Sequence, residues 1–146
     1  MARAIPYILY SDCEAAFDFL SRAFGFEEVL RYVGDAGYVN HAEMKLGDAR
    51  IFMGDPGDDY RNPRELGNET VGIYVYVDGD VDDLCRRAQE AGAEILEEPT
   101  DQAYGERRFT AKDPEGHVWF FGRPLREVTP EEWGATVAST ERAAAG

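Results

Sequence analysis

The chain has 146 residues, of which 44% are hydrophobic and 30% charged, and its formal net charge is −14. A chain of this length buries enough apolar surface to fold as one domain, so it needs neither disulfides nor a structural metal. Its acidic surface repels nucleic-acid phosphates and anionic lipid headgroups, which argues against nucleic-acid and membrane partners.

The two cysteines, Cys13 and Cys85, lack the spacing of a disulfide framework or a zinc site. The apolar run at the N-terminus ends at Asp12, well short of the roughly 20 apolar residues of a membrane-spanning helix. We therefore expect a protein of the reducing cytoplasm. Cys13 stands beside Asp12 and Glu14, whose charges oppose thiolate formation, so we do not predict a reactive thiol.

Taken in chain order, the first half predicts a strand, a helix and three further strands. IPYILY, which begins at Ile5, has the alternation and aromatic content of a strand. Ser11 and Glu14 form a predicted capping box for a helix that ends at Gly25. Further strands are predicted over Glu27–Val33, Tyr38–Leu46 and Ala49–Met53.

The second half repeats this plan. VGIYVYV predicts a strand, Asp80 caps the next helix and Gly92 ends it. Three strands follow at Glu94–Glu97, Arg107–Ala111 and His117–Phe121, and a DPEG turn precedes the last. The chain thus divides into a βαβββ module at 1–56, a linker at 57–70, a second module at 71–124 and a tail with a short helix at 125–146.

A tandem βαβββ repeat with a DPEGH turn resembles the vicinal oxygen chelate superfamily, which includes glyoxalase I, extradiol dioxygenases, fosfomycin-resistance enzymes and bleomycin-resistance proteins. The segments YILYSDCEAAFDFLSRAFGFEE and YGERRFTAKDPEGHVWFFG carry the resemblance. It implies an α+β fold in which two modules form a curved, partly open, barrel-like mixed sheet around a cavity, with helices outside. It also implies a homodimer, with Trp133 as a candidate contact, and leaves open whether modules pair within one chain or across the dimer.

Metal-dependent members of this superfamily place four ligands on the first and fourth strands of the modules. Carried over, these positions fall on Ile5, Phe52, Gly72 and Phe120, none of which offers a nitrogen, oxygen or sulfur side-chain donor. The resemblance therefore implies the bleomycin-resistance branch, with neither the usual metal nor another cofactor.

Strand alternation assigns a set of mostly aromatic side chains to the cavity. An apolar surface with a few polar groups is typical of a small-molecule site, although the same rings would also fill a sheet interior. The predicted ligand-binding residues are Tyr7, Phe52, Tyr74, Tyr76, Tyr104, Arg107, Phe109 and Phe120.

His41 and Glu43, two residues apart on one predicted strand, share a face and form the candidate catalytic pair. The alternative is a polar pair at the cavity rim or at a subunit contact. His117, beside the turn glycine, favours a structural hydrogen bond.

Three hypotheses follow from these features. The first is a non-enzymatic protein that sequesters an aromatic or cationic small molecule, as in antibiotic resistance. The second is a glyoxalase- or dioxygenase-like lyase or isomerase that uses His41 and Glu43, with or without a relocated metal. The third is an assembly module with a vestigial cavity.

Overall fold

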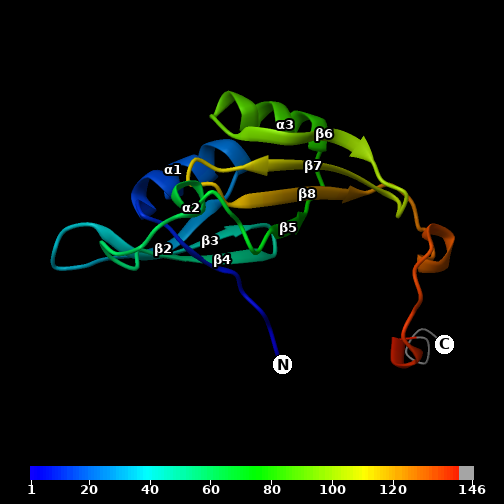
Figure 1. Cartoon of the computed structure of the whole chain (residues 1–146), viewed down its shortest axis with the longest axis horizontal. Coiled ribbons are helices and arrows are strands. Elements are labelled where there is room, and N and C mark those ends of the chain that lie inside the picture. The colour runs from blue at the N-terminus through cyan, green and yellow to red at the C-terminus, as the bar shows by residue number, and fades with distance from the viewer. Residues whose placement is uncertain (142–146) are drawn as a thin grey trace.

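The computed structural model describes residues 1–141 and contains two βαβββ modules (Figure 1). The first module comprises β1 (Tyr7–Leu9), α1 (Cys13–Phe24), β2 (Glu27–Val33), β3 (Val39–Leu46) and β4 (Ala49–Gly54). The second comprises β5 (Ile73–Tyr76), α3 (Val81–Glu90), β6 (Glu94–Asp101), β7 (Glu106–Lys112) and β8 (Val118–Pro124). A short helix, α2 (Pro63–Leu66), lies in the linker, and a 3₁₀-helix, η1 (Pro130–Trp133), lies in the tail. The predicted α+β fold is confirmed; the end of the predicted tail, 142–146, lies outside the described residues.

Each module forms its own four-stranded mixed sheet, and the two sheets have equivalent strand orders. The order is β1-β4-β3-β2 in the first sheet and β5-β8-β7-β6 in the second. In each, the first strand pairs in parallel with the fourth, and the other pairs are antiparallel. Both sheets are open within the described part of the chain, so together they do not make a closed barrel.

The start of α1 differs from the predicted capping box. Asp12 is the N-cap, and its Oδ1 accepts a hydrogen bond from the Ala15 N–H at 3.0 Å. The backbone N–H groups of Ser11 and Asp12 instead donate to the Glu115 carboxylate at 2.7 and 3.0 Å. Glu115 is 104 residues from Ser11 along the chain, so local sequence could not reveal this contact. Gly25 ends the helix in the left-handed conformation (φ 83°), as predicted.

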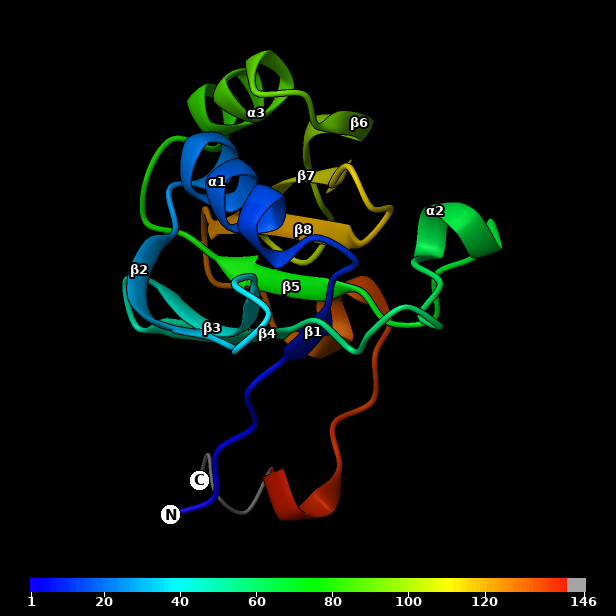
Figure 2. The same ribbon diagram turned by 90° about the vertical axis from the view of Figure 1, so that its left-hand side faces the viewer.

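The two modules share one hydrophobic core, which lies between the sheets. Figure 2 shows α1 and α3 on the inner side of the angle that the two sheets make. The Phe24 ring of α1 lies 5.4 Å from the Trp119 ring and 4.6 Å from the Phe121 ring of β8, centroid to centroid, and all three are buried. Because the helices fill this inner space, the opposite face of each sheet points outward.

Asp113, in the turn before β8, connects the two modules. Its carboxylate is 1% exposed, and Oδ2 accepts hydrogen bonds from the Tyr10 hydroxyl at 2.7 Å and the Trp119 indole N–H at 3.1 Å. Oδ1 accepts from the backbone N–H groups of Glu115 and His117. Burial and the neighbouring Asp113 carboxylate raise the pKa of Tyr10, so this hydroxyl remains a donor.

His117 takes a structural position, as the sequence favoured. Its Nε2 lies 2.9 Å from the carbonyl oxygen of Leu9, and its Nδ1 lies 3.2 Å from Oε2 of Glu69. The ring therefore joins β1, the linker and the start of β8. No helix among residues 1–141 has the length and apolar character needed to cross a membrane.

The two thiols should be unreactive in the folded protein. Cys13 and Cys85 are free and buried, and burial raises their pKa values to about 12 and about 11. At pH 8 both remain protonated, so we expect neither to react with a thiol reagent within minutes in buffer, while both react in urea. Rapid labelling of Cys13 in the folded protein would contradict this placement.

Candidate functional site

The outward face of the first sheet, here the first-module face, brings four predicted site residues together. Phe52 lies opposite both Tyr7 and Glu43 in the strand register. The Tyr7 hydroxyl is 3.1 Å from His41 Nδ1, and His41 Nε2 is 3.5 Å from Glu43 Oε1. The Tyr7 and Phe52 rings meet edge to face at 6.2 Å, and Tyr7 is 52% exposed. This face therefore presents two aromatic rings beside three polar groups in contact with one another: the Tyr7 hydroxyl, the His41 imidazole and the Glu43 carboxylate.

Two residues of β2 extend this face and were missed by the sequence analysis. Leu30 lies opposite Glu43, and Tyr32 lies opposite His41, and both side chains are exposed. Because alternate residues of a strand share a face, the two-residue spacing of Leu30 and Tyr32 could have identified them. Register shifts at Glu28/Leu30 and Tyr32/Val33 interrupt that alternation.

The outward face of the second sheet, the second-module face, carries an equivalent aromatic group. The Tyr74 and Phe120 rings stack at 5.6 Å with an interplanar angle of 16°, and Tyr76 lies 5.3 Å from Tyr74. The Tyr74 hydroxyl donates to Glu106, and desolvation together with this bond raises the pKa of Tyr74. Tyr74 is therefore a neutral donor near pH 7.

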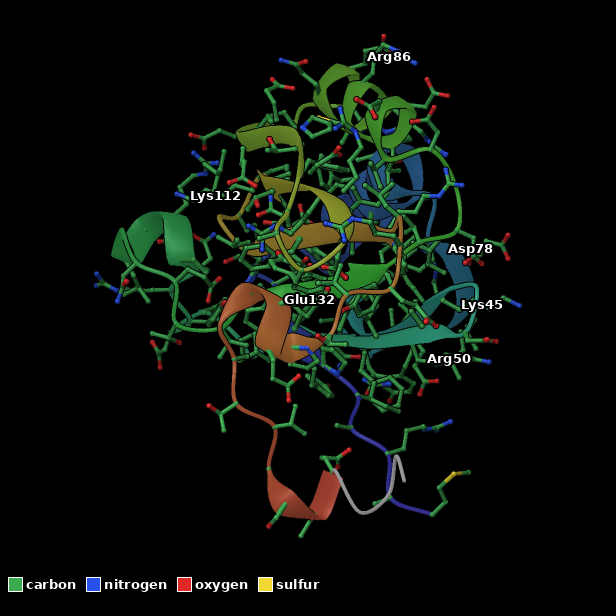
Figure 3. All side chains as sticks on the ribbon, turned by 90° about the vertical axis from the view of Figure 1, so that its right-hand side faces the viewer. Lys45, Arg50, Asp78, Arg86, Lys112 and Glu132 are labelled. Carbon is green, nitrogen blue, oxygen red and sulfur yellow. The ribbon has the colours of Figure 1, made fainter. Side chains whose placement is uncertain are left out.

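The tail lies beside the second-module face. Tyr104 precedes β7 and meets Trp133 of η1 edge to face at 5.9 Å. Figure 3 shows Glu132 of η1 over this side of the molecule, and Glu132 lines a cavity of about 540 Å³ together with Tyr104 and Glu106. The tail thus forms part of the rim of this face.

The predicted orientation of Arg107 and Phe109 was wrong. Phe109 is 0% exposed and stacks on Phe121 at 5.3 Å, on the helix side of the sheet. Arg107 also points to that side, where Asp82 of α3 accepts two of its hydrogen bonds at 2.8 and 2.9 Å. On the second-module face, β7 places Glu106 against Tyr74 and Arg108 beside Phe120, with the Arg108 guanidinium carbon 5.3 Å from the Phe120 ring centroid.

The four positions to which the resemblance assigns metal ligands are Ile5, Phe52, Gly72 and Phe120, and none has a side-chain nitrogen, oxygen or sulfur. A Cβ added to Gly72 would lie 2.5 Å from Cε2 of Phe120, because the Phe120 ring covers that glycine. Tyr7 covers Gly54 of β4 in the same way, at 2.6 Å. Among residues 1–141, no group of three or more His, Cys, Asp or Glu side chains is placed to hold a metal. The residues present do not fit the four-ligand centre.

The rings of the two faces do not meet within residues 1–141. Within the described residues, ring contacts join Tyr7, His41 and Phe52 to one another and Tyr74, Tyr76 and Phe120 to one another, and none joins the two groups. Tyr76 is 64% exposed. Each face is thus open to solvent in the described part of the chain.

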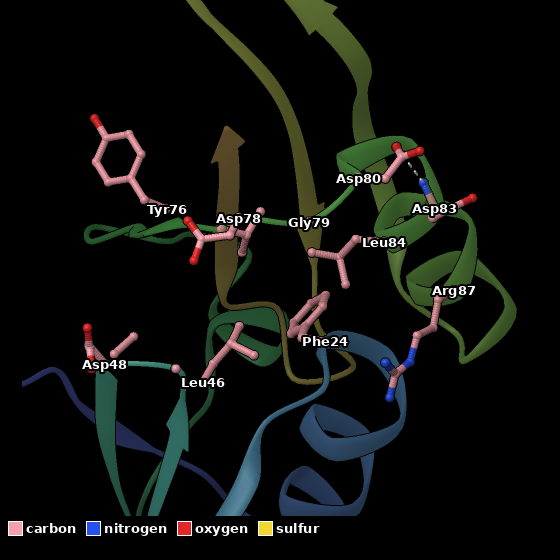
Figure 4. A pocket seen from close by; sticks show the side chains of 13 residues that line it. Phe24, Leu46, Asp48, Tyr76, Asp78, Gly79, Asp80, Asp83, Leu84 and Arg87 are labelled. Atoms are coloured by element: carbon pink, nitrogen blue, oxygen red, sulfur yellow. Dashed lines mark hydrogen bonds between the residues drawn. The ribbon is translucent and has the colours of Figure 1, made fainter. Parts of the chain in front are cut away.

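A separate cleft of about 570 Å³ lies between the modules (Figure 4). Apolar side chains, among them Phe24 and Leu84, form its centre, and Asp48 and Asp78 lie at one side. Of the predicted site residues only Tyr76 lines it. This cleft is therefore distinct from the two aromatic faces.

Comparison with known proteins defines the class to which this chain belongs. Residues 4–121 match the sequence model of the Glyoxalase/Bleomycin resistance protein/Dioxygenase superfamily, and the chain is a member of that superfamily.

Individual relatives agree with this assignment. An uncharacterized protein of Mycobacterium tuberculosis is 33% identical over 139 residues, covering 92% of this chain and 81% of that protein. TioX from Micromonospora sp. ML1 has a similar structure, with a TM-score of 0.68, 30% identity, and coverage of 88% of this chain and 100% of that one. The fosfomycin resistance protein FosX from Listeria monocytogenes shares the fold at 19% identity and a TM-score of 0.63, covering 90% of this chain and 97% of that one.

Proposed function

We propose that this protein binds and sequesters an aromatic or cationic small molecule between its aromatic faces, without the four-ligand metal centre of its enzymatic relatives. The observation that carries this proposal is the equivalent placement of exposed rings on the two faces. Tyr7 and Phe52 on the first correspond to Tyr74 and Phe120 on the second, in the same strand register. Flat aromatic molecules stack on such rings, and sequestration requires affinity alone.

Charge on the faces supports a cationic character for part of the ligand. Glu43 lies beside His41 and opposite Phe52 on the first-module face, and Glu106 lies against Tyr74 on the second. Carboxylates next to aromatic rings favour cations, because both the charge and the ring face attract them. The overall charge of −14 acts in the same direction.

We further propose that the cavity is completed by a second copy of the chain. Each face alone is exposed and carries large apolar side chains, including Tyr7, Leu30, Tyr32, Tyr74 and Tyr76. An exposed apolar patch of this kind is typical of an interaction surface. A homodimer that places the first-module face of one protomer against the second-module face of its partner encloses two equivalent cavities. The free thiols Cys13 and Cys85 support a cytoplasmic location.

Thermal unfolding with 9-aminoacridine, a flat aromatic cation, tests binding. Ligand at 100 times its Kd should stabilise the folded protein by about 2.7 kcal/mol. Phe120→Ala should weaken binding about tenfold through loss of one stacking partner. Tyr38→Ala, which removes an exposed ring beside the start of α1 and not on either face, is the matched control and should leave binding unchanged. Equal loss in both variants would contradict the assigned faces.

The second candidate is an enzyme that uses His41 and Glu43. The contact between these side chains, and that between His41 and Tyr7, favour it, because such a chain can transfer a proton. Metal analysis of the purified protein separates the two candidates. Stoichiometric zinc, nickel, manganese or iron that is lost in both His41→Ala and Glu43→Ala would favour the enzyme over the sequestering protein.

A further inference from the structure

We propose that the cleft between the modules is a second binding site, which takes a small molecule with a compact aliphatic body and one ammonium group. The cleft has a volume of about 570 Å³, within the range of roughly 300–1,000 Å³ that is typical of small-molecule sites. It is separate from the two aromatic faces, so this inference does not depend on the proposed sequestration of a flat molecule.

The floor of the cleft is aliphatic and continuous with the hydrophobic core. Leu46 at the end of β3, Val77 after β5 and Leu84 in α3 line it, and all three are partly buried and pack against the core. The Phe24 ring also lines the cleft, but it is 1% exposed because it belongs to the core. A ligand here therefore meets alkyl groups and not open ring faces, and an aliphatic body that covers them is favoured by the hydrophobic effect.

One side of the cleft carries two carboxylates that have no partner. Asp48 lies in the turn between β3 and β4, and Asp78 lies between β5 and α3, so each module supplies one of them (Figure 4). Both residues are exposed, and neither side chain accepts a hydrogen bond or forms an ion pair among residues 1–141. An ammonium group at this side of the cleft would be attracted by both carboxylates.

The remaining charged groups that line the cleft are engaged elsewhere. The Asp80 carboxylate caps α3, and the Asp83 carboxylate pairs with Arg86. The guanidinium of Arg87 donates to two carbonyl oxygens in the last turn of α1, at 2.7 and 3.0 Å. Because the C-terminal end of a helix is electronegative, this contact offsets the positive charge of Arg87. The charge left available in the cleft is negative, which favours a cation over an anion.

The aliphatic floor and the carboxylates are close enough in the chain for one small molecule to use both. Leu46 is two residues from Asp48, and Val77 is adjacent to Asp78. A compact amine can therefore cover the floor while its ammonium group stays at the exposed side. The ammonium group keeps part of its hydration there, so the cost of removing a charge from water is small.

Titration of ¹⁵N-labelled protein with 1-adamantylamine and with 1-adamantanol, followed by NMR, tests the inference. The two probes share one rigid aliphatic cage, which is not flat and stacks poorly on aromatic rings, and only the amine is charged. Both should shift the signals of Leu46, Val77 and Leu84. We expect the amine to bind about tenfold more tightly than the alcohol.

Substitution of the carboxylates tests where this preference arises. Asp48→Asn and Asp78→Asn should each weaken binding of the amine about threefold, and the double variant should bind the amine no more tightly than the alcohol. Asp35→Asn is the matched control: Asp35 is also exposed and has no partner among residues 1–141, but it lies in the turn before β3, at the other end of that strand from Asp48. This variant should leave both affinities unchanged within about twofold.

Four results would overturn the inference. Absence of binding by either probe would refute the site, and equal affinity for the two probes would refute its preference for a cation. An equal loss in Asp35→Asn and Asp48→Asn would show that the overall charge of the protein attracts the amine. Signal changes confined to the aromatic faces would refute the second site while leaving the proposed function intact.

Discussion

Asp113→Ala is expected to lower the free energy of unfolding by about 3–5 kcal/mol, a large fraction of the stability of a domain this size. The substitution removes both carboxylate oxygens at a buried position. The Tyr10 hydroxyl and the Trp119 indole N–H are then left unpaired, and two backbone N–H groups lose their acceptor. Because Tyr10 follows β1 and Trp119 lies in β8, the loss falls on the junction between the modules.

Urea denaturation of two further variants separates this network from general effects of substitution in the turn. Asp113→Asn keeps one carbonyl oxygen and should cost about half as much. Glu115→Ala removes a partly exposed carboxylate that accepts from Ser11 and Asp12, and should cost about 1 kcal/mol. A loss below 1 kcal/mol in Asp113→Ala would show that solvent satisfies these groups, contrary to their burial.

The second large effect concerns the ligand. Phe52→Lys and Phe120→Lys should each lower the affinity for 9-aminoacridine by about 100-fold, because each removes a stacking ring and places a positive charge beside a cationic ligand. Both positions are only partly buried, so the fold should tolerate either change. Calorimetric titration measures the affinity. Lys45→Met on the first-module side, which removes a positive charge without a ring, is the control and should not weaken binding.

The sequence predicted the elements well because the local signals were strong. Alternation identified the strands, Gly25 and Asp80 marked helix ends, and the repeated order of elements indicated two equivalent modules. Ser11 was predicted as the cap because Glu14 follows it at capping-box spacing. In the structure Glu115, from a distant turn, competes with that box by accepting hydrogen bonds from the N–H groups of Ser11 and Asp12. Such a competition is visible only once the tertiary structure is known.

The candidate site was predicted less completely than the fold. In β7 the wrong set of side chains was assigned to the cavity, although the sequence contained a signal for the right one. Arg107 and Phe109 were predicted to be the counterparts of His41 and Glu43. In the structure the counterpart of His41 is Arg108, because His41 lies opposite Gly54 in the first sheet and Arg108 lies opposite the equivalent Gly122 in the second. Phe109 and Ala111 are apolar, and Arg108 and Thr110 are polar. That alternation alone indicates which set faces the helices.

The outward orientation of the two faces could not be predicted from the sequence. It depends on α1 and α3 packing together between the sheets, where Arg87 of α3 donates to the carbonyl oxygens of Ser21 and Arg22 of α1. Helix amphipathicity shows only that each helix buries one side. The same packing leaves each aromatic face open to solvent. In the proposed homodimer, a second chain covers each face and completes the cavity.

Subunit complementation tests this account most directly. Phe52→Lys and Phe120→Lys chains, produced together with different affinity tags and isolated as the mixed dimer, carry one defective first-module face and one defective second-module face. If each cavity combines faces from two chains, one of the two cavities keeps both native faces, and the mixed dimer should bind about one 9-aminoacridine with native affinity, half the native amount. Absence of binding in the mixed dimer, or failure of the two chains to associate at all, would contradict it.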